Sequence, residues 1–160
     1  MLAMALSAHS QDYLKLMSYN IRNAKGMDNV HNIQRIANVI NNEAPDVVAV
    51  QELDSMTTRS NRTHVLAEVA ERTQMVANYA PAISFQGGKY GIGILSKEQP
   101  LAIRTYPLPG REEERMLMVA EFEDYFFACT HLSLTEEDRL ASLEIIKRSV
   151  GTSQKPFFLA

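Results

Sequence analysis

Apolar and polar positions along the chain alternate with periods that predict three helices. Apolar residues recur at helical spacing in 30–43, in 65–73 and in the segment after Thr135. Thr135 is a favourable N-cap, and the acidic residues that follow it suit the positive end of a helix dipole. The buried stripe of this third helix is predicted to consist of Leu140, Leu143, Ile146 and Val150.

Other apolar stretches have the length and composition of strands. The run Val47–Val50 is continuously apolar, which is typical of a strand buried on both faces. Residues 75–85 form a weaker strand region that Pro81 interrupts. Further strands are predicted at 14–21, 90–96 and 101–106, as a hairpin of 116–122 with 125–131, and in the last run from Pro156. This mixture of βα crossovers and antiparallel pairs predicts an α+β fold in which helices pack on one side of a mixed sheet.

Composition and charge change this picture little. The chain has 160 residues, of which 46% are hydrophobic and 22% charged, as expected for one globular domain. The net charge of −3 gives no general support for a nucleic-acid partner. No stretch reaches the roughly 20 apolar residues that a membrane span needs. The single cysteine, Cys129, lies in an apolar run and is expected to be a small core residue.

The first ten residues allow two interpretations. Residues 1–6 are apolar, and Ala8 and Ser10 fit the pattern of a signal-peptidase site before Gln11. Because a positively charged start is missing, 1–10 would be the remnant of a signal peptide, which implies a secreted or periplasmic protein. The alternative is a disordered tail, which leaves a cytoplasmic location open.

Three polar residues stand where predicted apolar strands end: Asn20, Glu52 and His131. Each has an ordinary explanation, as a turn former, a solvated carboxylate and a hydrogen-bonded strand end, respectively. Ligands of open α/β sheets, however, bind outside the carboxyl ends of the strands. Together the three residues would supply an amide oxygen, a carboxylate and an imidazole, a set that suits Mg²⁺ with several water positions left open.

Four motifs in order give a more specific indication, namely Tyr19–Ile21, Gln51–Glu52, Tyr90–Lys97 and Cys129–Leu132. In this order the chain resembles the endonuclease/exonuclease/phosphatase (DNase I-like) superfamily, from about Tyr13 to its end. The resemblance implies a four-layer α/β/β/α sandwich, of which residues 11–160 would be the N-terminal portion. It also implies a hydrolase of phosphodiesters or phosphomonoesters that depends on Mg²⁺, with Mn²⁺ as an alternative.

The resemblance gives roles to individual residues. Glu52 would bind the metal, and Asn20 would lie beside it and orient the metal shell or the phosphate. His131 would lie over the scissile phosphate as an electrostatic stabiliser or proton donor. Arg115 falls where relatives often place a phosphate-binding arginine; the alternative is a surface arginine paired with neighbouring glutamates.

The chain also departs from the family pattern, because a Gly-Asp-Phe-Asn-like motif and a late Asp-His pair are missing from it. We therefore expect an incomplete site and little turnover, with the activity belonging to a longer parent domain. The alternative is a non-catalytic remnant or an assembly module. The substrate class stays open between lipid head groups, sugar phosphates and nucleic acid. If the second sheet of the sandwich is missing, an exposed apolar face would cause self-association.

Overall fold

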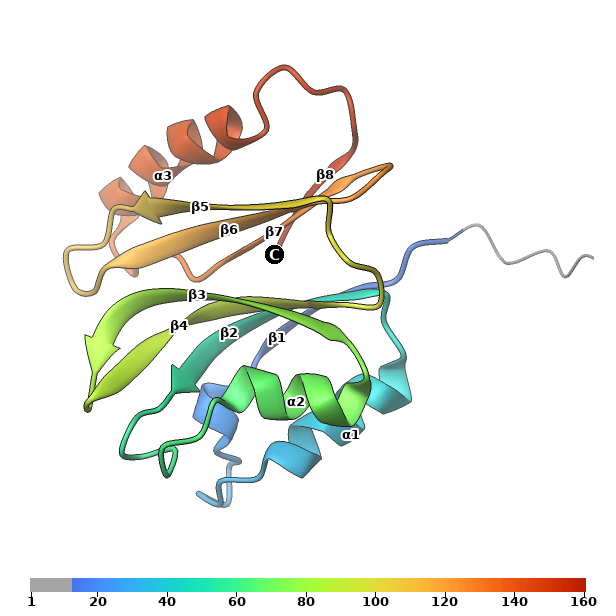
Figure 1. Ribbon diagram of the computed structural model, residues 1–160. Coiled ribbons are helices and arrows are strands. Elements are labelled where there is room, and N and C mark those ends of the chain that lie inside the picture. The colour runs from blue at the N-terminus through green and yellow to red at the C-terminus, as the bar shows by residue number, and fades with distance from the viewer. Residues whose placement is uncertain (1–12) are drawn as a thin grey trace, which may run out of the picture.

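The computed structural model describes residues 13–160 as two four-stranded sheets stacked face to face, with helices on both outer sides (Figure 1). The sandwich predicted by the resemblance is thereby confirmed, and helices cover two sides of the molecule instead of one. None of the helices in this described part has the length and apolarity of a membrane span. The signal-peptide interpretation concerns residues 1–10, which lie outside the described residues.

The first sheet has the strand order β1-β2-β4-β3. The chain passes from β1 through the crossover helix α1 to β2. β2 runs parallel to β1 and antiparallel to β4. The elements of this half are β1 (Leu16–Asn20), η1 (Arg22–Ala24), α1 (Ile33–Glu43), β2 (Val47–Ser55), α2 (Val65–Thr73), β3 (Val76–Phe85) and β4 (Gly88–Ser96).

The second sheet has the order β5-β6-β7-β8, with an antiparallel hairpin of β6 and β7 and a parallel pairing of β7 with β8. The predicted hairpin is therefore confirmed. Its elements are β5 (Ala102–Leu108), β6 (Arg115–Glu121), β7 (Phe126–Thr130), α3 (Glu136–Ser149) and β8 (Phe157–Leu159).

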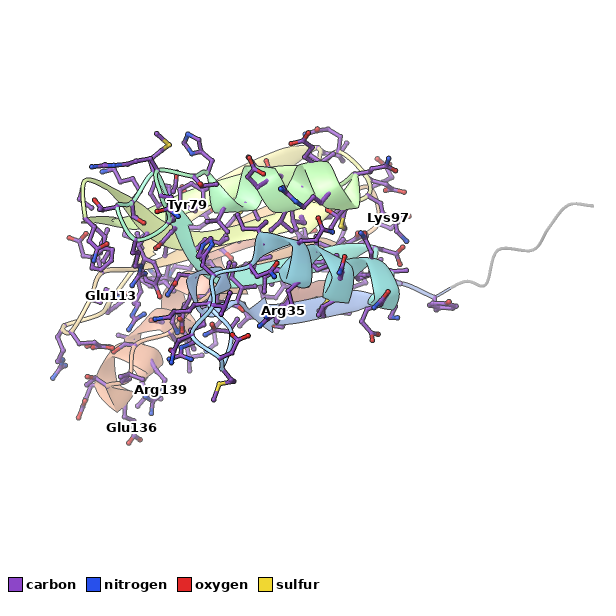
Figure 2. The ribbon with its side chains drawn as sticks, turned by 90° about the horizontal axis from the view of Figure 1, so that it is seen from below. Arg35, Tyr79, Lys97, Glu113, Glu136 and Arg139 are labelled. Carbon is purple, nitrogen blue, oxygen red and sulfur yellow. The ribbon has the colours of Figure 1, made fainter. Side chains whose placement is uncertain are left out.

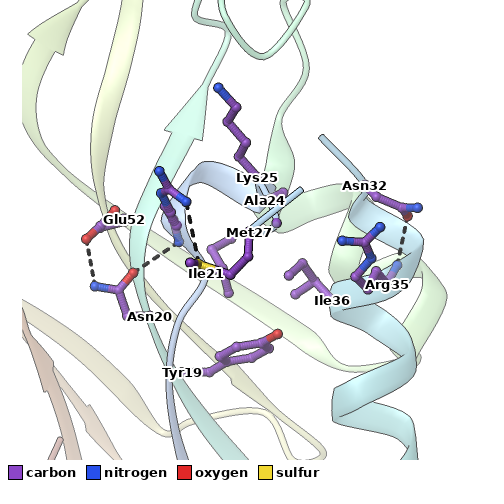
Figure 3. Close-up of a pocket in the computed structure, with 12 residues that line it drawn as sticks. Tyr19, Asn20, Ile21, Ala24, Lys25, Met27, Asn32, Arg35, Ile36 and Glu52 are labelled. Carbon is purple, nitrogen blue, oxygen red and sulfur yellow. Dashed lines mark hydrogen bonds between the residues drawn. The ribbon is translucent and has the colours of Figure 1, made fainter. Parts of the chain in front are cut away.

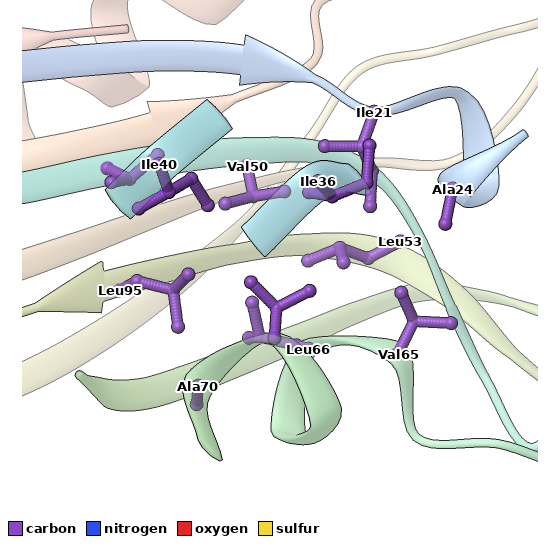
Figure 4. Packing of buried hydrophobic residues seen from close by; sticks show 12 residues of the cluster. Ile21, Ala24, Ile36, Ile40, Val50, Leu53, Val65, Leu66, Ala70 and Leu95 are labelled. Carbon is purple, nitrogen blue, oxygen red and sulfur yellow. The ribbon is translucent and has the colours of Figure 1, made fainter. Parts of the chain in front are cut away.

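Three apolar layers hold the sandwich together. In the outer layer of the first sheet, α1 and α2 cover β2 and β4 (Figure 4). A middle layer joins the two sheets and contains Cys129, which is buried as predicted. A third layer lies between α3 and the second sheet. Alternate residues of β6 and β7 belong to the middle and third layers, as the two-residue period of a strand requires.

The face that α3 buries differs from the predicted stripe. Leu140 and Leu143 are 57% and 44% exposed, and Ile146 is the one member of the stripe that is fully buried. Polar side chains occupy the inner positions because the Asp138 carboxylate accepts hydrogen bonds from the backbone N–H of Arg111 and from Ser133. The helix is therefore oriented by polar contacts at its start, and its leucines point outward.

Two other expectations change. Pro81 does not interrupt the strand region; β3 is continuous, and its register shifts between Pro81 and Ile83, which an edge strand tolerates. The expected self-association depends on an uncovered sheet face, but the second sheet covers the first through the middle layer. That reason for self-association does not hold, and self-association itself stays a prediction.

The orientation of α3 can be tested by two truncations. Ile146→Ala should lower the free energy of unfolding by about 2–4 kcal/mol, because it leaves a cavity under the helix. Leu140→Ala should change it by less than about 0.5 kcal/mol, because its side chain is mostly in solvent. Urea unfolding followed by circular dichroism measures both, and equal losses would contradict the orientation.

Candidate functional site

A bulge in β2 places the Glu52 carboxylate. Val50 pairs with Gly93 and Leu53 pairs with Gly91, so two residues of β2 lie opposite one residue of β4. The extra residue shifts the alternation of side chains between the two faces of the strand. Val50 and Leu53 differ by three in number, so a regular strand would place them on opposite faces, but both pack in the outer layer. Glu52 is thereby released from the regular pattern in the middle of β2. The expectation that this strand ends at Glu52 is wrong, because β2 continues to Ser55 and both Leu53 and Asp54 are buried.

The backbone of Glu52 is strained. Its φ is 61°, in the left-handed region that a non-glycine residue enters at a cost of about 1–2 kcal/mol. Such strained residues concentrate at functional sites, where surrounding contacts enforce them. Eleven non-glycine residues of the described part have a positive φ, and Glu52 is the one among them that lies inside a strand. A strained conformation at this position supports a functional role for the glutamate.

Asn20 at the end of β1 holds the carboxylate in place (Figure 3). Its Nδ2 donates to Glu52 Oε1 at 2.7 Å, and its Oδ1 accepts from the backbone N–H of Arg22 at 3.0 Å. The second contact fixes the orientation of the amide, since only the oxygen can accept. Asn20 thus turns its N–H groups, and not its oxygen, toward Glu52.

Neighbouring Gln51 ties the two sheets together behind the site. It is 6% exposed, and its Nε2 lies 3.3 Å from Ser18 Oγ and 3.6 Å from Cys129 Sγ. Through these contacts the end of β2 is fixed to β1 in its own sheet and to β7 in the other. His131 directly follows β7, so the sheets bring Glu52 and His131 to the same end of the molecule.

Arg115 lies beside His131 and is buried. It pairs with Glu112 at 3.3 Å and with Glu113 at 3.1 Å, and its Nη1 lies 3.5 Å from His131 Nδ1. The predicted pairing with neighbouring glutamates is confirmed, but the predicted surface position is wrong, because the residue is only 7% exposed. An N–H of Arg115 at Nδ1 leaves the imidazole proton on Nε2.

Burial lowers the pKa of His131, and the charge of Arg115 lowers it further. Glu52 and Glu113 oppose this shift with a smaller effect. The imidazole is therefore neutral at pH 7 and offers Nε2–H as a hydrogen-bond donor. The neutral form favours the role of a donor over that of a fixed positive charge.

Three hollows join these residues into one surface. One hollow is lined by Glu52, Arg59, Tyr90 and Glu113 among others. Tyr90 and Glu113 also line a small hollow with Arg115 and His131. Glu52 in turn lines a cavity of about 490 Å³ on its other side. Because each hollow shares residues with the next, we call this continuous surface the groove.

Tyr90 and Glu113 were not identified from the sequence as site residues. Burial raises the pKa of the Tyr90 hydroxyl, and the charges of Glu52 and Glu113 raise it further, so the phenol remains a donor at neutral pH. Tyr90 begins one of the four motifs, which could have pointed to it. Glu113 lies at one end of the molecule, opposite the end that carries Lys97, so this part of the groove is at that end (Figure 2).

The donor set fits a hard cation only in part. Within residues 13–160 no group of three or more His, Cys, Asp or Glu side chains is close enough to hold a metal ion. Glu52 can supply one carboxylate, which is consistent with Mg²⁺, because Mg²⁺ keeps several waters and often takes one or two protein carboxylates. Asn20 would orient that carboxylate, since its own oxygen is occupied by Arg22.

Comparison with known proteins agrees with the fold. A family described as the Endonuclease/Exonuclease/phosphatase family matches residues 17–160. An endonuclease/exonuclease/phosphatase from Beutenbergia cavernae DSM 12333 is similar in structure, with a TM-score of 0.70 and 22% identity over 86% of this chain and 44% of that one.

Two further structures are also similar. D. rerio TDP2, solved in complex with a single-strand DNA product, has a TM-score of 0.65 and 16% identity over 90% of this chain and 58% of its own. ANGEL2, a 2′,3′-cyclic phosphatase, has a TM-score of 0.59 and 15% identity over 81% of this chain and 44% of its own. At these identities the likeness shows the fold, and the chain spans about half the length of the structures it matches.

The strain at Glu52 predicts an unusual order of stability. Glu52→Gly should be more stable than Glu52→Ala by about 1 kcal/mol, because only glycine adopts a positive φ without cost. At exposed Lys89 in β4 the order should reverse, with alanine more stable by about 0.5–1 kcal/mol. Chemical denaturation of the four variants measures this, and an alanine advantage at position 52 would contradict the strained bulge.

The environment of His131 predicts a pH effect. Its ring protons should titrate below the ordinary value of 6.5 in the folded protein and near it in urea. Because the unfolded state then binds more protons, this residue's contribution to stability is present above pH 6.5 and is lost as the pH falls toward the folded pKa. His131→Gln should remove that part of the pH dependence. An NMR midpoint above 6.5 would show that Glu52 and Glu113 dominate instead.

Proposed function

The chain belongs to the endonuclease/exonuclease/phosphatase family, and on that premise we propose that its groove is part of a divalent-metal-dependent phosphoesterase site. The single observation that carries the proposal is the Glu52 carboxylate, which a strained bulge within β2 and the Asn20 amide at the end of β1 hold in place. A free exposed glutamate would need neither the strain nor the partner.

In this proposal Glu52 anchors Mg²⁺, or Mn²⁺ in its place, with Asn20 as a positioning residue. The ion would neutralise charge on the phosphate and act as a Lewis acid. Only Oε1 of Glu52 is engaged by Asn20, so the other carboxylate oxygen is available. Water and phosphate oxygens would complete the shell.

His131 is proposed to bind a phosphate oxygen. Its Nε2–H is the free donor of the ring, because Arg115 occupies the Nδ1 side. A donor aimed at a phosphate oxygen stabilises the negative charge that develops during hydrolysis. Arg115 then acts through His131, and its enclosed guanidinium makes direct contact with phosphate a secondary role at most.

The substrate class is proposed as a phosphate ester. Relatives of the same fold include TDP2, which was solved with a single-strand DNA product, and ANGEL2, a 2′,3′-cyclic phosphatase. Nucleic acid, sugar phosphates and lipid head groups all present the phosphate oxygens that this groove would bind. The described residues are assigned metal anchoring and phosphate binding, and none is assigned the role of general base.

One observation favours a second candidate function. Residues 13–160 present no complete cluster of metal ligands, as a non-catalytic binding module of the same fold would. Under that alternative Glu52 would have no special affinity for divalent metal ions. The two candidates therefore differ in a directly measurable property.

Metal binding distinguishes the phosphoesterase site from the non-catalytic binding module. Adding Mn²⁺, whose unpaired electrons broaden nearby resonances, should broaden the NMR signals of Asn20, Glu52 and their neighbours, and Mg²⁺ should compete. Glu52→Gln should weaken binding at least about tenfold, because it removes the only assigned charged ligand. Glu123→Gln removes the same charge in the β6–β7 turn and serves as the control. Equal broadening in wild type and Glu52→Gln would favour the binding module.

A further inference from the structure

We propose that the cavity beside Glu52 is a subsite for a second anionic group of the substrate. The protein would then prefer phosphate esters that carry another phosphate close to the one that reacts. This inference rests on the proposed function, because Glu52 is taken to mark where the reacting phosphate binds.

The position of the cavity separates it from the reacting phosphate. Its volume is about 490 Å³, and it is formed by the end of β1, the η1 turn and the start of α1 (Figure 3). Glu52 lines it on one side and lines the hollow leading toward His131 on the other. A phosphate held between Glu52 and His131 would therefore leave this cavity to the adjoining group of the same molecule.

The charges in the cavity favour an anion. Its lining contains three cations, Arg22, Lys25 and Arg35, but only one acidic residue, which is Glu52. Arg35 pairs with Asp28 at 2.8 Å. The other two make no ion pair within residues 13–160, and Arg22 contacts only the sulfur of Met27 through its side chain. This local excess is notable in a chain whose net charge is −3.

The floor of the cavity strengthens those charges. It contains Ile21 and Ile36, which are 3% and 7% exposed, together with buried Ala24. An apolar floor excludes water on one side and so lowers the local dielectric constant. A cation above such a floor binds an anion more strongly than the same cation on a convex surface.

The turn that carries the cations is held firmly. Arg22, Asn23 and Ala24 have φ values of 48°, 46° and 61°, three consecutive residues in the left-handed region. The Ile21 N–H donates to Gln51 O, and the Asn32 N–H donates to Ala24 O, so contacts on both sides enforce the turn. The backbone that carries Arg22 and Lys25 is therefore fixed at the cavity before any ligand binds, and only their side chains need to be ordered on binding.

Two probes that differ by one phosphate test the proposal. The whole chain, in the presence of Mg²⁺, is titrated calorimetrically with adenosine 3′,5′-bisphosphate and with adenosine 5′-monophosphate. We expect the bisphosphate to bind about tenfold more tightly, as one additional charge-assisted contact provides. Fructose 1,6-bisphosphate and fructose 6-phosphate form a second pair, which shows whether the preference needs a nucleoside.

Single substitutions locate the effect. Lys25→Gln and Arg22→Gln should each remove most of the preference and leave monophosphate binding nearly unchanged. Lys147→Gln, on the far helix α3, removes the same charge and should alter neither. The preference should also weaken with added salt more than monophosphate binding does. Thermal unfolding of each variant confirms that the fold is kept.

The outcomes are distinct. Monophosphate binding that depends on Glu52 but shows no bisphosphate preference, or a preference that both substitutions leave intact, would overturn the subsite and leave the proposed function standing. No binding of either probe would overturn both. A preference in the nucleotide pair alone would assign the subsite to nucleotides, and one in both pairs would assign it to the second phosphate itself.

Discussion

β2 pairs with two neighbouring strands and packs against two apolar layers at once. The register change at Glu52 lets the strand satisfy both the pairing and the packing along its whole length. Upstream of the bulge, Val48 and Val50 face the helices while Val47 and Ala49 face the second sheet. At the bulge Gln51 still reaches the second sheet, and Leu53 returns to the helical side. The geometry around the carboxylate is therefore a consequence of how the sheet keeps its core intact.

Two glycines of β4, Gly91 and Gly93, pair with the residues on either side of that bulge. A Cβ at Gly93 would lie 2.5 Å from Leu66 Cδ2 and 2.8 Å from Leu53 Cδ1, so any other residue would displace both leucines from the strand. A Cβ at Gly91 would collide with the backbone of β3 at Ala80. Packing thus explains why a Gly-x-Gly pattern stands opposite the site, independently of any contact with a ligand.

Much of this could be predicted from the sequence where a local pattern determines the outcome. The apolar run Val47–Val50 requires a strand covered on both faces, and Asn20 and His131 stand at strand ends as expected. Glu52 does not, because β2 continues to Ser55 and a bulge, which no local pattern predicts, places its carboxylate. The outward leucines of α3, the burial of Arg115 and the cations around the cavity could not be predicted. Each depends on partners distant in sequence, such as the Arg111–Asp138 contact that orients α3, and no periodicity contains that information.

The bulge has a consequence for how such a site can be gained or lost. Val50 and Leu53 would keep their layers if the extra residue were absent, because the two-residue alternation would then simply continue through Gln51. Loss of one codon at position 52 would leave the hydrophobic core complete and relieve a strained backbone while erasing the carboxylate. A descendant that had lost the carboxylate in this way could remain fully folded, and only selection on the role of that carboxylate would keep the longer strand.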